Sequence, residues 1–173
     1  MLNLDVLIDE QTISKRLDEM AKIIEQEYKN EDIVFICILK GSLPFTWELT
    51  KRINNPNITF DFMEISSYGD SLETSGKITV KKDLSSNIEN KNVIILEDII
   101  DTGITLSYLA DYLKTKNPKT LKIATLLSKP SRRMVDVPVD YIGFTIEDKF
   151  VLGFGLDLEQ KYRNLPYVAY VKN

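Results

Sequence analysis

Three apolar runs constrain the fold of this chain more than any other feature. They are IVFICIL at 33–39, VIILE at 93–97 and LKIATLL at 121–127. Each has the length of a strand, and the first is continuous and rich in β-branched residues. Such a run is typical of a strand that is covered on both faces, as in a parallel sheet. The sequence therefore predicts a central sheet between two layers of other structure.

Helices are expected between these runs. Apolar residues at spacings of four, three and four predict an amphipathic helix at Thr12–Tyr28. Ser42 is a candidate cap for a second helix, which has Pro44 in its first turn and ends at Arg52 or Ile53. A third helix is predicted at Thr105–Lys116. Alternating strands and helices indicate an α/β fold, with a mostly parallel twisted sheet flanked by helices and joined by right-handed crossovers.

Shorter apolar segments predict the remaining strands. These are Ile58–Ser66, Lys77–Lys81, Tyr141–Phe144, Phe150–Phe154 and Tyr167–Val171. The polar segment Ser67–Gly76 is expected to be a long loop. Since the last third of the chain is more strand and loop than helix, we expect a small hood lobe near the chain ends. It would lie over one end of the sheet, within a single domain of residues 1–173.

Charge and cysteine content restrict the partners and the compartment. The formal charge is −4, and no stretch holds more than two adjacent basic residues. We therefore expect no nonspecific binding to nucleic acid or to a membrane surface. The single cysteine, Cys37, excludes a disulfide within the chain and favours a reduced compartment. The N-terminus has no signal-peptide pattern, and no apolar run approaches the ~18 residues that span a bilayer. We expect a cytoplasmic protein.

Histidine is absent from the sequence. Serine–histidine, cysteine–histidine and histidine–metal mechanisms are therefore excluded within the chain. Acid–base chemistry would use Asp, Glu, Lys or Tyr, and any metal would be an oxygen-liganded ion such as Mg²⁺.

The segment LEDIIDTGITL, which follows a predicted strand and leads into a helix, is the strongest candidate site. Free N–H groups at the start of a helix, together with threonine hydroxyls, suit a phosphate. Three carboxylates beside a phosphate suit a sugar diol, a metal-bound diphosphate and a base that loses a proton. The alternative is a solvated acidic turn between a strand and a helix.

This segment resembles the signature of the type I phosphoribosyltransferases. Four other segments resemble the 6-oxopurine branch, the hypoxanthine-guanine type in its bacterial form. They are LKGS at 39, SSYGDSLETSG at 66, LLSKPSRR at 126 and DKFVLGFGLDLEQKYRNLPYV at 148. The resemblance runs from about Val6 to Val171. It implies transfer of a phosphoribosyl group from phosphoribosyl diphosphate to a 6-oxopurine, as in purine salvage.

The resemblance also assigns residues to phosphoribosyl diphosphate and Mg²⁺. A cis peptide is expected at Lys40, and the loop after Ser67 would close as a lid. Mg²⁺ would bind at Glu97 and Asp98, with a second ion at Asp157. The residues implied for phosphoribosyl diphosphate are Lys40, Gly41, Ser67, Tyr68, Glu97, Asp98, Asp101, Thr102, Gly103, Ile104, Thr105 and Arg163.

For the purine, the resemblance implies that Asp101 accepts a proton near N7 and that Lys129 donates to the 6-oxygen. Phe150 would stack on the base, while Val151 and Asp157 would lie at its edge. Ordinary alternatives exist for these residues. They are a solvated Lys129, a core Phe150 and a surface ion pair of Asp157 with Arg163. Phe150 and Asp157 can reach one ligand only if the chain bends at Gly153 and Gly155.

Other functions remain open at this stage. A phosphoacceptor signalling domain would need acids after the first predicted core strand, where this chain has Leu39-Lys40. A regulator with this fold could bind nucleotide and RNA, and a xanthine-preferring enzyme would differ only around the purine 2-position. The resemblance further suggests a homodimer or homotetramer.

Overall fold

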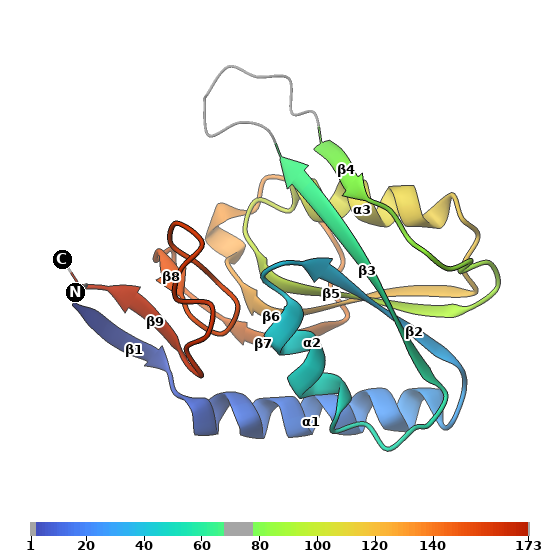
Figure 1. Cartoon of the computed structure of the whole chain (residues 1–173), viewed down its shortest axis with the longest axis horizontal. Helices are drawn as coiled ribbons and strands as arrows, with labels where there is room; N and C mark the ends of the chain where they lie inside the picture. Colours follow the sequence, from blue (N-terminus) through green and yellow to red (C-terminus); the bar gives the residue numbers. More distant parts are fainter. Residues whose placement is uncertain (1–2, 68–77, 173) are drawn as a thin grey trace.

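A six-stranded sheet forms the centre of the computed structural model, which describes residues 3–67 and 78–172 (Figure 1). In spatial order its strands are β4 (Ile78–Lys82), β3 (Ile58–Ser67), β2 (Ile33–Leu39), β5 (Asn92–Ile100), β6 (Thr120–Ser128) and β7 (Tyr141–Thr145). Neighbouring strands from β3 to β7 are parallel, and only β4 is antiparallel to its neighbour. The predicted α/β fold with a mostly parallel sheet is confirmed.

Helices cover both faces of this sheet. Phe35 of β2 belongs to the buried cluster formed with α1 (Glu10–Tyr28) and α2 (Leu43–Thr50). The next residue, Ile36, belongs to a second cluster formed with α3 (Ile104–Lys114). Successive residues of a strand point to opposite faces, so the continuous apolar run is explained by two separate cores.

A second, three-stranded sheet joins the two ends of the chain. Its antiparallel strands, in order, are β1 (Leu4–Ile8), β9 (Val168–Val171) and β8 (Val151–Leu152). Figure 1 shows this sheet to one side of the main sheet, with the N- and C-termini close together. The sequence had assigned no strand to Leu4–Ile8. Its partner lies more than 160 residues away (Leu4 pairs with Val171), so no local pattern announces the pairing.

Two expectations about the last third of the chain were wrong. Residues Tyr141–Thr145 do not join the lobe, because β7 pairs with β6 in the main sheet, with Tyr141 opposite Ala124. The strand expected at Phe150–Phe154 has only two residues. Gly153 and Gly155 have φ values of 91° and 100°, a conformation that suits glycine and turns the chain. The predicted bend at these glycines is confirmed.

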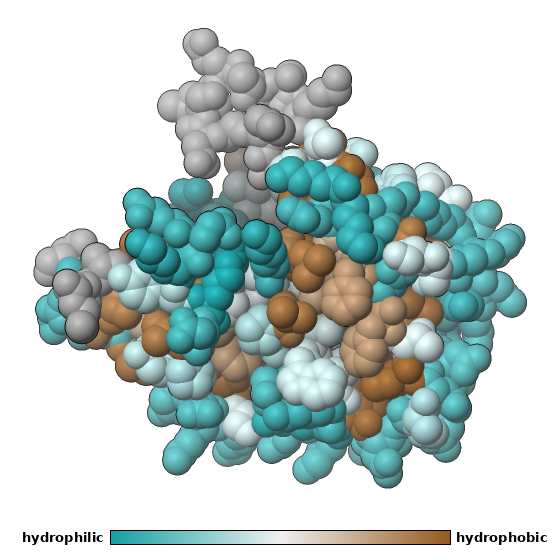
Figure 2. Space-filling view, in the orientation of Figure 1, coloured by the Kyte–Doolittle hydropathy of each residue, from teal (hydrophilic) through white to brown (hydrophobic). Residues whose placement is uncertain are grey.

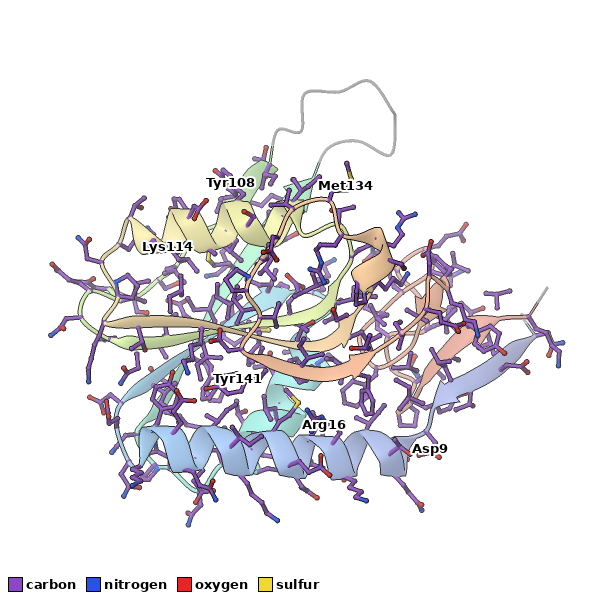
Figure 3. All side chains as sticks on the ribbon, turned by 180° about the vertical axis from the view of Figure 1, so that it is seen from behind. Asp9, Arg16, Tyr108, Lys114, Met134 and Tyr141 are labelled. Atoms are coloured by element: carbon purple, nitrogen blue, oxygen red, sulfur yellow. The ribbon has the colours of Figure 1, made fainter. Side chains whose placement is uncertain are left out.

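The starts of α1 and α2 differ in how they are capped. α1 begins earlier than expected because Asp9 (Figure 3) accepts a hydrogen bond from the Thr12 N–H at 2.7 Å. Ser42 precedes α2, but its hydroxyl donates to the Ile38 carbonyl at 2.7 Å and does not cap the helix. A short 3-10 helix, η1 (Pro130–Arg132), follows β6. No helix in the described part of the chain is both long and apolar enough to cross a membrane.

Candidate active site

The parallel pairing of β2 and β5 brings two predicted site segments together at one edge of the sheet. Cys37 of β2 lies opposite Leu96 of β5, so the turn after β2 lies next to the acids that follow Leu96. A Cβ atom on Gly41 would lie 1.7 Å from Asp98 Oδ2, so only glycine allows the backbone to approach this carboxylate. The Leu39–Lys40 peptide is cis, as the resemblance implied, and Lys40 is exposed.

Glu97 and Asp98 belong to a strand, although a loop was expected after Glu97. β5 continues to Ile100, and its last residues pair in parallel with β6, with Glu97 opposite Thr125 and Ile99 opposite Leu127. The backbone that carries both carboxylates is therefore held by sheet hydrogen bonds. Such a support gives their positions a precision that a loop would not give.

These two carboxylates have few partners. Glu97 Oε1 accepts from the Asp98 N–H at 3.2 Å, and Asp98 Oδ1 accepts from the Ile99 N–H at 2.7 Å. Within residues 3–67 and 78–172, no Lys or Arg nitrogen lies within 4.0 Å of either carboxylate. Burial and the neighbouring charge of Asp98 raise the pKa of Glu97 well above its usual range, and burial also raises the pKa of Asp98. An added cation would stabilise the ionised pair.

This donor set fits a magnesium ion. Mg²⁺ is commonly held by one or two carboxylates, with substrate phosphates and water as its other ligands. Among the described residues, no three His, Cys, Asp or Glu side chains form a group that could hold a metal. Glu97 and Asp98 therefore do not form a complete cage with Asp157, and a metal at this edge would depend on ligands from outside the protein.

The predicted phosphate loop, residues 101–105, leads into α3. Gly103 precedes the helix with a φ of 84°, and a Cβ atom there would lie 2.7 Å from the Val135 carbonyl oxygen. The Thr102 carbonyl accepts from the N–H groups of Met134 and Val135 at 2.9 and 3.1 Å. A cavity of about 110 Å³ lies beside the loop, between it and the end of β5. The residues lining it are Glu97, Ile99, Ile100, Asp101, Thr102, Gly103, Thr105 and Leu106.

Asp101 has a partner that the sequence did not indicate. The Arg132 Nε–H donates to Asp101 Oδ1 at 3.0 Å. Arg132 lies in the LLSKPSRR segment that supported the resemblance, but it was not assigned a role. The two residues are 31 positions apart, and only the pairing of β5 with β6 brings them together.

The exposure of Lys129 and Phe150 tests the ordinary alternatives for these two residues. Lys129 is only 7% exposed, so the alternative of a solvated lysine is wrong. Its ammonium lies 3.6 Å from Asp148 Oδ1. Phe150 is 58% exposed, so the alternative of a core residue is also wrong. Val151 is buried in β8.

Asp157 and Arg163 form the ion pair that was the ordinary alternative for these two residues, with 2.7 Å between Arg163 Nη2 and Asp157 Oδ1. Arg163 Nη1 also donates to the Gly155 carbonyl at 2.7 Å. Gly155 in turn lies against the turn after β2, because its Cβ position is 1.9 Å from the Gly41 carbonyl oxygen. The C-terminal segment therefore contributes to the same edge as Gly41 and Asp98.

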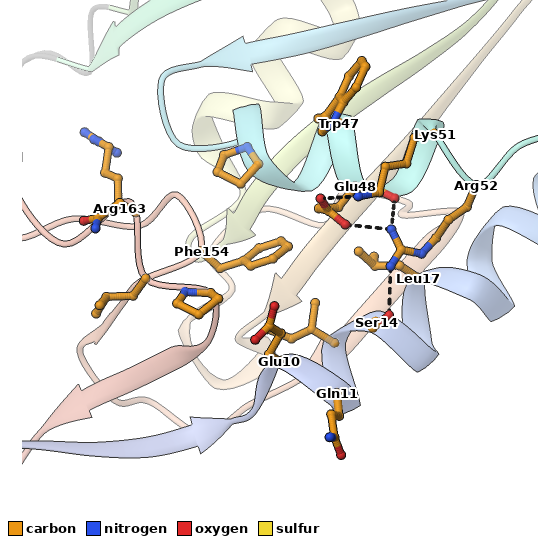
Figure 4. Close-up of a pocket in the computed structure, with 15 residues that line it drawn as sticks. Glu10, Gln11, Ser14, Leu17, Trp47, Glu48, Lys51, Arg52, Phe154 and Arg163 are labelled. Atoms are coloured by element: carbon orange, nitrogen blue, oxygen red, sulfur yellow. Dashed lines mark hydrogen bonds and ion pairs between the residues drawn. The ribbon is translucent and has the colours of Figure 1, made fainter.

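A larger cavity lies elsewhere in the fold. It has a volume of about 780 Å³ and lies between α1, α2 and the segment around Leu165 (Figure 4). Of the predicted site residues, only Arg163 lines it. Figure 4 shows Arg163 at one end of this cavity and Arg52 at the other.

Ser67 and Tyr68 lie at the boundary of the described residues. Ser67 is the last residue of β3. Tyr68 and the rest of the expected lid loop, to Gly76, lie outside the described residues.

Known proteins resemble this chain over nearly its whole length. The family model described as a phosphoribosyl transferase domain matches residues 4–159. The hypoxanthine-guanine phosphoribosyltransferase of Bacillus subtilis is 44% identical over 167 residues, which cover 96% of this chain and 92% of the relative. A crystal structure of such an enzyme from Bacillus anthracis superposes with a TM-score of 0.93 at 46% identity, covering 99% of this chain and 100% of that one. A hypoxanthine phosphoribosyltransferase structure from Staphylococcus aureus gives a TM-score of 0.93 at 42% identity, covering 99% and 92%.

Proposed function

Because the chain belongs to the phosphoribosyltransferase family, we propose that it makes purine nucleotides by salvage. It transfers the 5-phosphoribosyl group of phosphoribosyl diphosphate to N9 of hypoxanthine or guanine, which gives IMP or GMP and diphosphate. The observation that carries this proposal is the pair Glu97 and Asp98, which lies between the Gly41 turn and the loop before α3 and has no ion-pair partner among the described residues. A magnesium-bound sugar diphosphate has the charge and shape for this edge.

The proposal divides phosphoribosyl diphosphate among three segments. Lys40 and the Gly41 backbone bind the diphosphate together with Arg163, whose planar guanidinium suits phosphate oxygens. Glu97 and Asp98 accept from the ribose hydroxyls. The 5′-phosphate binds at the start of α3. Its binding residues are Asp101, Thr102, Gly103, Ile104 and Thr105, mainly through their N–H groups, and Ser67 and Tyr68 complete the diphosphate site.

Glu97 and Asp98 are also the residues that would hold Mg²⁺, and Asp157 would contribute to a second ion. The metal, when bound, screens the carboxylates from the phosphates and stabilises negative charge on the departing diphosphate. The raised pKa values of Glu97 and Asp98 support this assignment, because a cation is what would keep both ionised near neutral pH.

The purine would lie between Phe150 and the Lys129 end of β6. N9 attacks the anomeric carbon as diphosphate leaves, so positive charge develops on the ribose ring. Asp101 accepts the proton from N7, or stabilises it, and Lys129 donates to the 6-oxygen. A 6-amino group offers no such acceptor, so adenine should be a poor substrate. Phe150 stacks on the ring, Val151 binds its edge through backbone groups, and Asp157 lies beside it.

The test is a direct assay. The protein is mixed with phosphoribosyl diphosphate and Mg²⁺, and hypoxanthine, guanine, xanthine, adenine and uracil are added separately. Nucleoside monophosphate is measured by chromatography. Product from hypoxanthine or guanine that disappears with EDTA is expected. Product only from xanthine would favour the xanthine alternative, and no product from any base would leave RNA binding by a regulator of this fold as the next hypothesis.

We also propose that the chain is a single domain that forms a homodimer or a homotetramer. Three large apolar side chains support self-association. Leu43, Trp47 and Phe60 are 50%, 61% and 40% exposed. Figure 2 shows apolar surface gathered over α2 and β3, the elements that carry them. Light scattering would test this, with a monomeric mass as the contrary result.

A further inference from the structure

Four charged side chains form a continuous chain at the base end of the proposed site. Arg132 Nε donates to Asp101 Oδ1 at 3.0 Å. Arg132 Nη1 lies 3.6 Å from Asp148 Oδ2, and Asp148 Oδ1 lies 3.6 Å from Lys129 Nζ. Two positive and two negative groups therefore alternate, and these four side chains, called the charge chain below, carry no net charge together.

The backbone fixes the two ends of this charge chain. Lys129 donates its N–H to the Ile100 carbonyl at 2.9 Å, which ties the end of β6 to the residue before Asp101. The Arg132 N–H donates to the Lys129 carbonyl at 3.2 Å, which holds η1 close to both. Arg132 and Asp148 are about half exposed, while the Lys129 side chain is 9% exposed. The middle of the charge chain is thus open to solvent, whereas Lys129 at its end is buried.

Both ends keep capacity for a ligand. Asp101 Oδ2 accepts no hydrogen bond from any described residue, because Arg132 uses Oδ1. The Lys129 ammonium has three donors, and Asp148 can take only part of that capacity. On a 6-oxopurine, N7 and the 6-oxygen are neighbouring atoms on one edge of the ring. A carboxylate oxygen can accept a proton at N7, and an ammonium can donate to a lone pair on the 6-oxygen.

We propose that Arg132 and Asp148 are positioning residues, which hold Asp101 and Lys129 at the spacing that this purine edge requires. The inference rests on the proposed function. Without Arg132, Asp101 loses its fixed partner and Asp148 is left to attract Lys129 alone, away from the base. Without Asp148, Lys129 loses the anion that orients it. Neither Arg132 nor Asp148 touches the purine, so both act through Asp101 and Lys129.

The test compares steady-state kinetics of Arg132→Gln, Asp148→Asn and the double variant, with hypoxanthine and phosphoribosyl diphosphate varied separately. Each single variant should raise the KM for hypoxanthine about tenfold, with a smaller fall in kcat. The KM for phosphoribosyl diphosphate should not change. Because the two residues act in one chain, the double variant should cost no more than the worse single variant. Arg132→Lys should restore part of the lost affinity for hypoxanthine.

A matched control is Lys114→Gln, since Lys114 (Figure 3) also forms a 3.0 Å ion pair, with Asp111 on α3. It removes one positive charge and should leave both KM values unchanged. An Arg132→Gln enzyme with wild-type kinetics would overturn the inference, as would an equal rise of both KM values. Failure of the wild type to make nucleotide from any base would instead contradict the proposed function.

Discussion

The two strands that flank β2 carry acids with opposite electrostatic surroundings. On β3, the Asp61 carboxylate accepts from the N–H groups of Phe62, Ser85 and Ser86 at 2.8, 2.9 and 2.8 Å, and from the Ser86 hydroxyl at 2.6 Å. On β5, Glu97 and Asp98 accept only from backbone N–H groups next to them. The fold satisfies the first acid completely, whereas it leaves the pair on β5 to be satisfied by a ligand.

The pKa values express the same contrast. Burial by itself would raise the pKa of Asp61, but hydrogen bonds from the Ser86 hydroxyl and from three backbone N–H groups hold that pKa below its usual value. Burial and the charge of Asp98 raise the pKa of Glu97, burial raises the pKa of Asp98, and the few hydrogen bonds do not compensate. Asp61 therefore stabilises the fold as a carboxylate, while the ionised pair destabilises the ligand-free protein.

The largest expected effect is on activity. Asp98→Asn should lower kcat/KM for nucleotide formation by about 100-fold or more, because an amide cannot replace the carboxylate charge beside the proposed metal and diphosphate. The free energy of unfolding should stay equal or rise, since one of two repelling charges is gone. Steady-state kinetics and urea unfolding of the same preparation check both parts. A variant that is both inactive and unstable would break the comparison with Asp61.

Asp61→Asn should lower stability and leave activity unchanged, the reverse of Asp98→Asn. Losing a buried carboxylate that accepts four hydrogen bonds should lower the free energy of unfolding by about 3 kcal/mol, without altering KM for either substrate in the folded fraction. Urea unfolding at neutral pH measures the loss. Glu19→Gln, which removes a half-exposed carboxylate from a surface ion pair with Arg16, is the control and should change stability by less than about 1 kcal/mol.

The pH dependence of stability should separate the two acids. Because its folded pKa is lowered, the contribution of Asp61 is fully present above the ordinary carboxyl pKa of about 4 and is lost as pH falls through the folded value. Glu97 and Asp98 have raised folded pKa values, so the stability of the free protein falls as pH rises from about 4 through those folded values. This loss is relieved as pH falls toward about 4.

Unfolding between pH 5 and 8 should therefore show less stability loss with rising pH in a Glu97→Gln/Asp98→Asn variant than in the wild type. Identical pH profiles for the two proteins would contradict the assignment of the raised pKa values to this pair.

The smallest expected effect is thermal. Mg²⁺ together with inorganic diphosphate, at about ten times the apparent Kd, should stabilise the folded state by about 1.4 kcal/mol and raise Tm by roughly 3–6 °C. Differential scanning calorimetry would measure the shift. The shift should disappear in the Glu97→Gln/Asp98→Asn variant and persist in Asp61→Asn, from its lower starting Tm. A shift that survives in the double variant would place the metal elsewhere.

Much of the fold could be read from local patterns. The continuous apolar run at Ile33–Leu39 gave a strand with the predicted bounds, because burial on both faces leaves no polar position within it. The acidic segment and the Gly103 turn could also be predicted from local sequence, because a strand end, a turn and a helix start each have residue preferences. The bend predicted at Gly153 and Gly155 is present, and both glycines have positive φ values.

The features that the sequence did not reveal depend on register and on long-range contacts. β5 extends past Glu97 because β6 pairs with it to Ile100, and a pattern within 93–97 cannot show that partner. Strand β1 and the placement of β7 in the main sheet depend in the same way on distant neighbours. The pairing of Arg132 with Asp101 needs two strands to end side by side.

The sequence by itself thus determined which groups are present: the predicted phosphate loop, an acidic pair and a turn at Lys40-Gly41. The tertiary structure alone decided how they are used. It placed the Gly41 backbone against Asp98, gave Asp61 all its hydrogen bonds and left Glu97 and Asp98 without an ion-pair partner among the described residues. The physical reason is that residue type fixes what a side chain can bind, while packing and strand register fix which of those partners it meets.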